Sequence, residues 1–157
     1  MSNTMRWRYG DTNPVMLPVA AETVIEIGDL IYQVDGEAFP ASAQEDQTTE
    51  AANQEAFHDA FVGVAMQCSP DGSADPVRVA TSGVFEFVCP SGTFDVGDLV
   101  GVDEAASGTA LEDQVVASVA TANLAVGRCA RRVTPAATRV LVSIESTLMA
   151  GGVQAAA

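Results

Sequence analysis

The sequence lacks lysine altogether and contains one histidine and one tryptophan among its 157 residues. Without lysine the chain cannot form a Schiff base, supply the lysine of a phosphate-binding loop, or carry biotin or lipoate. Its seven basic residues are arginines against 21 acids, which gives a formal net charge of −14 at pH 7. Because phosphate binding needs concentrated positive charge, we expect neither nucleic acid nor an anionic membrane as a partner. The acidity is also typical of an abundant protein that has to stay soluble.

Cysteine and long apolar runs are scarce as well. The three cysteines, Cys68, Cys89 and Cys129, cannot all pair, and their spacing fits no zinc-binding pattern. We therefore expect buried or half-buried free thiols in a protein made in a reducing cytosol. No apolar run approaches the length of a membrane span, and we expect no signal peptide in the N-terminal residues. With 48% apolar residues, the chain is expected to form one domain with a substantial core.

The most informative pattern that is present is a motif that occurs twice. Residues 27–31 (Ile-Gly-Asp-Leu-Ile) return as residues 96–100 (Val-Gly-Asp-Leu-Val). Two further pairs of similar segments follow in the same order: 62–65 with 126–130, and 78–79 with 139–140. Offsets of about 60–70 residues indicate a duplicated β unit that is longer than the repeats of solenoid proteins. A Gly-Asp turn before a β-branched run predicts a strand, with Asp29 and Asp98 each capping backbone N–H groups.

Short apolar runs separated by Gly- and Pro-containing turns predict a mainly β protein, a small β-barrel or sandwich. The predicted strands are 23–34 (as a first strand pair), 62–68, 77–81, 84–89, 99–102, 115–120, 125–133 and 139–146. Residues 38–49 are predicted to form a polar loop, and turns are predicted to interrupt the strands at 90–92 and 134–137.

One short helix is predicted over about residues 50–61, capped by Thr48 or Thr49. A helical projection places Phe57 and Phe61 toward the core and His58 on the opposite, solvent side. We expect the phenylalanine pair to seal one end of the sheet core.

The predicted organisation is an extended N-terminal arm at 1–20, a single β-rich domain at 21–148 and a flexible C-terminal tail at 149–157. The arm contains prolines that favour an extended path, and cations alternate with aromatics in Arg6, Trp7, Arg8 and Tyr9. An exposed tryptophan between arginines either anchors in a partner's pocket or holds the arm as a strap over its own barrel. The sequence leaves both interpretations open.

Candidate catalytic groups are few. His58 and Cys68 are the one pair that could form an activated thiolate, but no motif near Cys68 would stabilise an oxyanion. The acid pairs at 103–104 and 112–113 are typical of solvated turns, and the loop 71–75 has too few ligands for calcium. We therefore predict no catalytic residue, no metal site and no cofactor, and expect that the protein is not an enzyme.

Six segments of the chain are common β-strand sequences one by one, but their order and spacing together are more specific for a protein family. The segments are 7–10 (Trp7-Arg8-Tyr9-Gly10), 24–32, 57–65 (Phe57 followed by Phe61-Val62-Gly63-Val64-Ala65), 79–87, 97–101 and 125–128. In this order and spacing, from about residue 7 to 146, the chain resembles the capsid cement proteins, or head decoration proteins, of tailed bacteriophages.

The resemblance implies a small β-rich protein that assembles as a homotrimer on the outer surface of an icosahedral phage head. There it would clamp neighbouring subunits of the major capsid protein and stabilise the expanded shell, after being made in the host cytoplasm. The family has no catalytic residues, and the interface is expected at Arg6, Trp7, Arg8 and Tyr9, above all at Trp7. Two other interpretations are another phage structural β domain, associated with a tail or fibre, and a carbohydrate-binding module, for which exposed aromatic residues are few.

Overall fold

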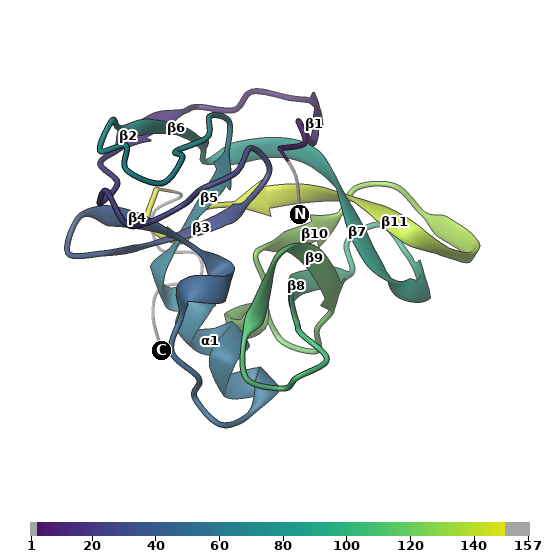
Figure 1. The fold of residues 1–157 in the computed structure, drawn as a ribbon. Coiled ribbons are helices and arrows are strands. Elements are labelled where there is room, and N and C mark those ends of the chain that lie inside the picture. The colour runs from purple at the N-terminus through teal and green to yellow at the C-terminus, as the bar shows by residue number, and fades with distance from the viewer. Residues whose placement is uncertain (1–2, 150–157) are drawn as a thin grey trace.

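The computed structural model describes residues 3–149, and in it the chain forms two sheets that share a core. The first sheet runs in the order β2 (Val15–Leu17), β6 (Val77–Ala80), β5 (Phe61–Ala65), β3 (Leu30–Val34) and β4 (Glu37–Pro40). The second runs in the order β1 (Trp7–Tyr9), β7 (Ser82–Phe94), β11 (Val133–Glu145), β10 (Gly127–Cys129), β8 (Leu99–Glu104) and β9 (Leu111–Ser118). Figure 1 shows the first sheet at upper left and the second at right.

The second sheet closes on itself, because β7 also pairs in parallel with β9. Strands β7–β11 therefore form a five-stranded barrel, and β1 is an additional strand beside β7. The helix α1 (Glu50–Ala60) lies below the first sheet and contacts β3 and β8 (Figure 1). Two short 3₁₀ helices, η1 (Ala41–Ala43) and η2 (Ala122–Leu124), complete the described elements. The prediction of a mainly β protein with a small barrel and one short helix is confirmed.

The two sheets repeat one topology, which supports the internal duplication predicted from the repeated motif. We call strands β2–β6 the first unit and strands β7–β11 the second unit. Numbered along the chain from one to five, the strands of both units follow the order 1-5-4-2-3 across the sheet. The first unit has a closing contact as well, since Ala38 N in β4 donates to Pro18 O, just beyond β2 (3.0 Å). α1 and η2 occupy the same place, between the third and fourth strands of their units.

The strand registers agree in detail. Ile31 lies opposite Gly63 in the first unit, and Val100 lies opposite Gly127 in the second. The predicted equivalence of the third pair of segments, 78–79 with 139–140, is wrong by two residues, however. The register places Val79 opposite Ala65, and the equivalent partner of Cys129 is Val142, so that 78–79 corresponds to 141–142 rather than to 139–140. Alternating β-branched residues along the last strand make such a shift invisible in the sequence.

The two Gly-Asp turns have the same local geometry. Gly28 and Gly97 both have positive φ (100° and 95°), a conformation that favours glycine. Asp29 Oδ2 accepts from Glu26 N at 2.9 Å, and Asp98 Oδ2 accepts from the N–H three residues upstream at 2.8 Å. The prediction that each aspartate caps its turn is confirmed.

The core is continuous between the units. One cluster combines Leu30, Tyr32, Phe57 and Phe61 of the first unit and α1 with the interior of the second barrel. A smaller cluster, which includes Ile31, fills the inside of the first unit. Because side chains alternate along a strand, β3 contributes to the shared core on one face and to the smaller core on the other.

The predicted helix is confirmed, and Thr49 Oγ1 accepts from Ala52 N at 3.2 Å as its N-cap. The solvent-facing position predicted for His58 is wrong: its side chain is buried, and its Nδ1 donates to Ala125 O at 2.7 Å. Asn53 and Gln54 are buried on the same face, so the core side of α1 is largely polar. A projection that equates polarity with exposure cannot identify such a face.

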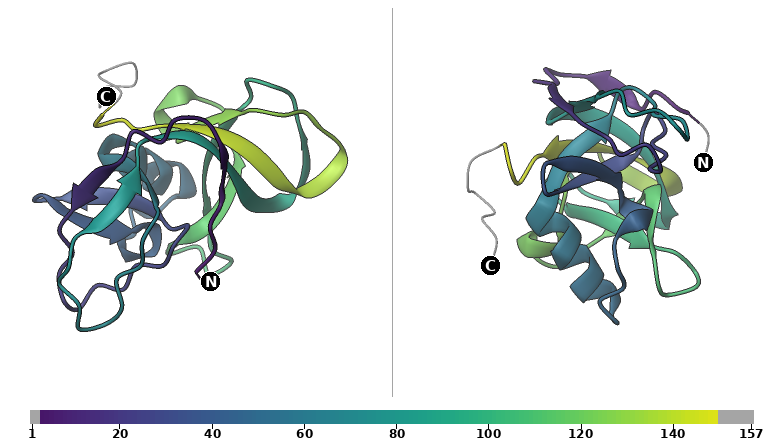
Figure 2. Two further views of the ribbon diagram at one scale, coloured as in Figure 1. Left: turned by 90° about the horizontal axis from the view of Figure 1, so that it is seen from above. Right: turned by 60° about the vertical axis from the view of Figure 1, so that its left-hand side comes forward.

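Three segments predicted as a loop or turn are regular structure instead. β4 extends into the predicted loop at 38–49, η1 lies within it, and β7 runs through the predicted turn at 90–92. β11 runs through 134–137 in the same way, and register shifts between Val133 and Arg139 absorb Pro135 as a bulge does. β7 and β11 consequently extend together beyond the barrel as a two-stranded ribbon, at right in Figure 1 and at right in the left view of Figure 2.

Of the arm predicted at 1–20, residues 1–2 lie outside the described residues. Residues 3–20 are extended but take part in both sheets through β1 and β2. Of the predicted tail, residues 150–157 lie outside the described residues.

Candidate interaction surface

The arm lies over the barrel of its own chain. β1 pairs antiparallel with β7, with Trp7 opposite Phe85 and Tyr9 opposite Val84. Trp7 Nε1 donates to Gly10 O at 3.0 Å, which fixes the indole ring on the arm itself. The ring is still 40% exposed, and Tyr9 is 52% exposed. The strap interpretation of the arm therefore holds, while its aromatic residues face solvent from a rigid strand.

Arg6 differs from the other three residues of the predicted interface, because it is buried. Its Nε and Nη2 both donate to Gln114 Oε1, at 3.0 and 2.8 Å, and its guanidinium lies 5.7 Å from the ring centre of Phe87. Burial and the nearby Arg139 and Arg8 lower the pKa of Arg6. Arg6 thus holds the arm to the barrel, and the exposed members of the predicted interface are Trp7, Arg8 and Tyr9.

Arg8 connects the arm to a second group of arginines through Glu86. Glu86 Oε1 lies 3.1 Å from Arg8 Nη2 and 3.8 Å from Arg139 Nη1. Beside Glu86 is a groove of about 290 Å³ along β11, lined by Arg131, Arg132 and Arg139 together with half-buried apolar residues such as Leu141. We call it the arginine groove. Arm and groove form one continuous surface along β7 and β11.

The arginine groove stands out because the rest of the chain is acidic. Thirteen acids and no basic residue lie between Arg8 and Arg78, whereas no acid lies between Asp113 and Glu145, where four arginines occur. The ion pair of Arg132 Nε with Asp95 Oδ1 (3.3 Å) is highly exposed on both sides, so it adds little stability. These arginines are not among the predicted interface residues, although the acid-free stretch between Asp113 and Glu145 indicates a local excess of positive charge.

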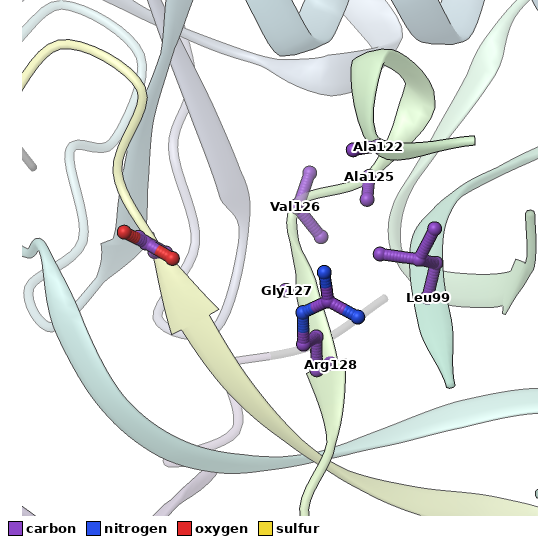
Figure 3. Close-up of a pocket in the computed structure, with 7 residues that line it drawn as sticks. Leu99, Ala122, Ala125, Val126, Gly127 and Arg128 are labelled. Atoms are coloured by element: carbon purple, nitrogen blue, oxygen red, sulfur yellow. The ribbon is translucent and has the colours of Figure 1, made fainter. Parts of the chain in front are cut away.

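A small cavity lies between β8, β10 and the segment around η2, lined by Leu99, Ala122, Ala125, Val126, Gly127, Arg128 and Glu145. Figure 3 shows Leu99, Val126 and Arg128 around it. Its volume is about 30 Å³, which admits a water molecule but not an organic substrate.

The structure does not bring the two candidate catalytic residues, His58 and Cys68, together. His58 is buried against η2, whereas Cys68 is exposed in the turn after β5. All three cysteines are free, as predicted, but the expected burial is wrong for Cys68, which is exposed. Burial raises the pKa of the Cys89 and Cys129 thiols. Within residues 3–149, no group of three or more His, Cys, Asp and Glu side chains is placed to hold a metal ion. The described part of the chain also has no helix long and apolar enough to cross a membrane.

The two turn aspartates have the same geometry but different surroundings. Asp29 is 2% exposed, and its Oδ1 accepts from Gln114 Nε2 at 2.8 Å. Burial raises the pKa of Asp29 from 3.8 to about 6, against the opposing effect of its hydrogen bonds. Asp98 is exposed. Gln114 therefore connects the buried Arg6 of the arm to the buried Asp29 of the first unit.

No protein-family model matches the chain, and no curated protein sequence matches it. Among solved structures, the chain is similar to the crystal structure of the head fiber gp8.5 N base in bacteriophage phi29. The match covers 84% of this chain and 94% of that one, with 15% identical residues and a TM-score of 0.44.

Proposed function

We propose that this protein is a capsid cement protein that binds the outer surface of an icosahedral phage head as a homotrimer. It clamps neighbouring subunits of the major capsid protein and so stabilises the expanded shell. The observation that carries the proposal is the exposed aromatic strand β1, which is held rigidly on the barrel beside the arginine groove. The resemblance of the ordered sequence segments to cement proteins supports it independently of the fold.

The mechanism needs no chemistry. A protein that binds only the assembled, expanded shell stabilises that shell by mass action. Because the arm is already fixed by Arg6 and by pairing with β7, little conformational entropy is lost when Trp7 and Tyr9 contact a partner. Three copies in one trimer then act together through their high effective concentration on the shell.

The test is binding to purified expanded heads that lack their decoration protein, measured by co-sedimentation over a concentration series. Trp7→Ala should weaken binding by about 30-fold or more, as expected for a central aromatic anchor, and Trp7→Phe should retain most of the affinity. Met16→Ala is the matched control, because Met16 is exposed to 52% on β2, which belongs to the other sheet than β1.

Two results would contradict the proposal. One is wild-type protein that does not bind expanded heads at any concentration. The other is equal binding of Trp7→Ala and wild type, which would remove β1 from the interface. Gold labelling of virions that places the protein on the tail or on fibres would identify it as a different structural component.

A further inference from the structure

The chain carries two surfaces of opposite charge. The first is the arginine groove, with Arg131, Arg132 and Arg139. Among residues 3–149, only two acids lie within ion-pair distance of these arginines, Asp95 and Glu86, and Glu86 is shared with Arg8. Arg131 makes no ion pair with any residue that the structure describes. The groove therefore keeps an excess of positive charge, although the chain as a whole has a net charge of −14.

The second surface lies at the start of α1, where five acids gather: Glu45, Asp46, Glu50, Asp103 and Glu104. Asn53 connects two of them, because its Nδ2 donates to Asp46 Oδ1 at 3.1 Å and to Glu104 Oε2 at 2.9 Å. Burial and the carboxylates of Asp103 and Glu104 raise the pKa of Glu50. None of the five is in an ion pair within residues 3–149. We call this the acidic end.

The two surfaces cannot neutralise each other within one molecule. The acidic end lies with α1 at the bottom of Figure 1, whereas the groove lies with β11 on the ribbon that projects to the right. A cyclic trimer, however, needs exactly such a pair, since each subunit contacts the next through two different, complementary surfaces. Copies that each carry −14 repel one another, so a contact between them needs local charge complementarity.

We propose that the arginine groove of one copy binds the acidic end of a second copy of this chain, in a head-to-tail contact. The inference rests on the proposed function, because it assigns the contact that would build the proposed trimer. The half-buried apolar residues of the groove, Val133 and Leu141, then become covered by the acidic end, while the arginines pair with its carboxylates. Trp7 and Tyr9 remain free for the shell.

The experiment measures self-association by analytical ultracentrifugation, with charge reversals in the full chain. Arg131→Glu with Arg132→Glu should weaken association at least about 10-fold, and so should Glu45→Arg with Glu50→Arg. A chain that carries all four reversals should recover association, because its groove is acidic and its helix end is basic. Two reversals of each sign cancel, so this chain keeps the formal net charge of −14. Arg78→Glu is the control for an exposed arginine outside both surfaces, on β6.

The residues to be changed are exposed, and circular dichroism checks that each variant is folded. Wild type that stays monomeric at all concentrations overturns the inference. So does a variant with all four reversals that is folded but does not regain self-association, while both double variants are folded. If the arginine variant still forms trimers but no longer binds expanded heads, the groove contacts the shell instead. That outcome overturns the head-to-tail contact and leaves the proposed function standing.

Discussion

Asp29 and Asp98 occupy the same kind of turn, but only the buried Asp29 also takes part in a network of buried polar side chains. Each carboxylate accepts from the backbone N–H three residues upstream, but Asp29 is also the acceptor at the end of the hydrogen-bonded series Arg6–Gln114–Asp29. Gln114 is fully buried and is oriented by both neighbours, since its oxygen faces the guanidinium and its amide group faces the carboxylate. A polar network of this kind specifies one arrangement of arm, first unit and barrel.

The raised pKa of Asp29 predicts a pH-dependent stability. A carboxyl with a pKa of about 6 in the fold and 3.8 in the unfolded chain binds its proton more tightly when folded. Its contribution to the unfolding free energy is therefore complete below pH 4 and is lost as the pH rises through 6, on the order of 2–3 kcal/mol. Urea unfolding at pH 4.5, 6 and 7.5 gives the slope of the unfolding free energy against pH. The variant Asp29→Asn should lack the fall in unfolding free energy that wild type shows as the pH rises.

Asp98→Asn is the matched control for this measurement, because Asp98 occupies the same turn while exposed. It should keep the wild-type slope. Equal slopes for Asp29→Asn and wild type would show that Asp29 is not the group responsible for the pH dependence.

At the scale of elements, two glycines let strands approach each other closely. Gly63 in β5 and Gly127 in β10 are equivalent positions of the two units. A Cβ at Gly63 would overlap the Ala80 carbonyl, and one at Gly127 would overlap the equivalent Ser143 carbonyl. Because backbone atoms cannot move aside as a flexible side chain can, Gly63→Ala and Gly127→Ala should each cost about 3 kcal/mol or more in unfolding free energy.

Gly92→Ala is the control for this pair, since Gly92 lies in β7 and a Cβ there would come no nearer than 3.7 Å to Pro90 O. Thermal unfolding followed by circular dichroism should give a melting temperature close to that of wild type. If Gly127→Ala were as stable as Gly92→Ala, the close approach of β10 to β11 would not be a constraint on the second unit.

The elements also show where prediction from sequence succeeds. The ends of α1 are predicted to within one residue, because they depend on local signals: a threonine N-cap, and a change from helical to strand spacing of the apolar residues. Its buried face depends on distant groups: Gln54 Nε2 donates to Val102 O at 2.9 Å, and His58 donates to Ala125 O. The same distinction applies to the surface. The arginines are visible as a charge run, but the joining of Arg8 and Arg139 by Glu86 depends on strand registers that the sequence does not display.

At the scale of the whole molecule, the duplicated topology raises the question of whether the two units fold separately. Several contacts join them, among them Gln54 to Val102 O, His58 to Ala125 O, and Ser42 N to Asp113 Oδ1 at 2.7 Å. The larger core cluster contains residues of both units as well. The second barrel thus buries part of its surface only against the first unit and α1.

We therefore predict one cooperative unfolding transition. The probes are circular dichroism for the whole chain and thiol labelling for the second unit, in a Cys68→Ser background that leaves the buried Cys89 and Cys129. Ile31→Ala removes a side chain from the smaller core, which belongs to the first unit, at a cost of about 2–5 kcal/mol. If the units are coupled, this variant exposes both thiols at the same lowered urea concentration at which the ellipticity is lost. Thiols that stayed protected through a first transition would instead mean that the second barrel is stable alone, and that the duplication joined two independent folding units.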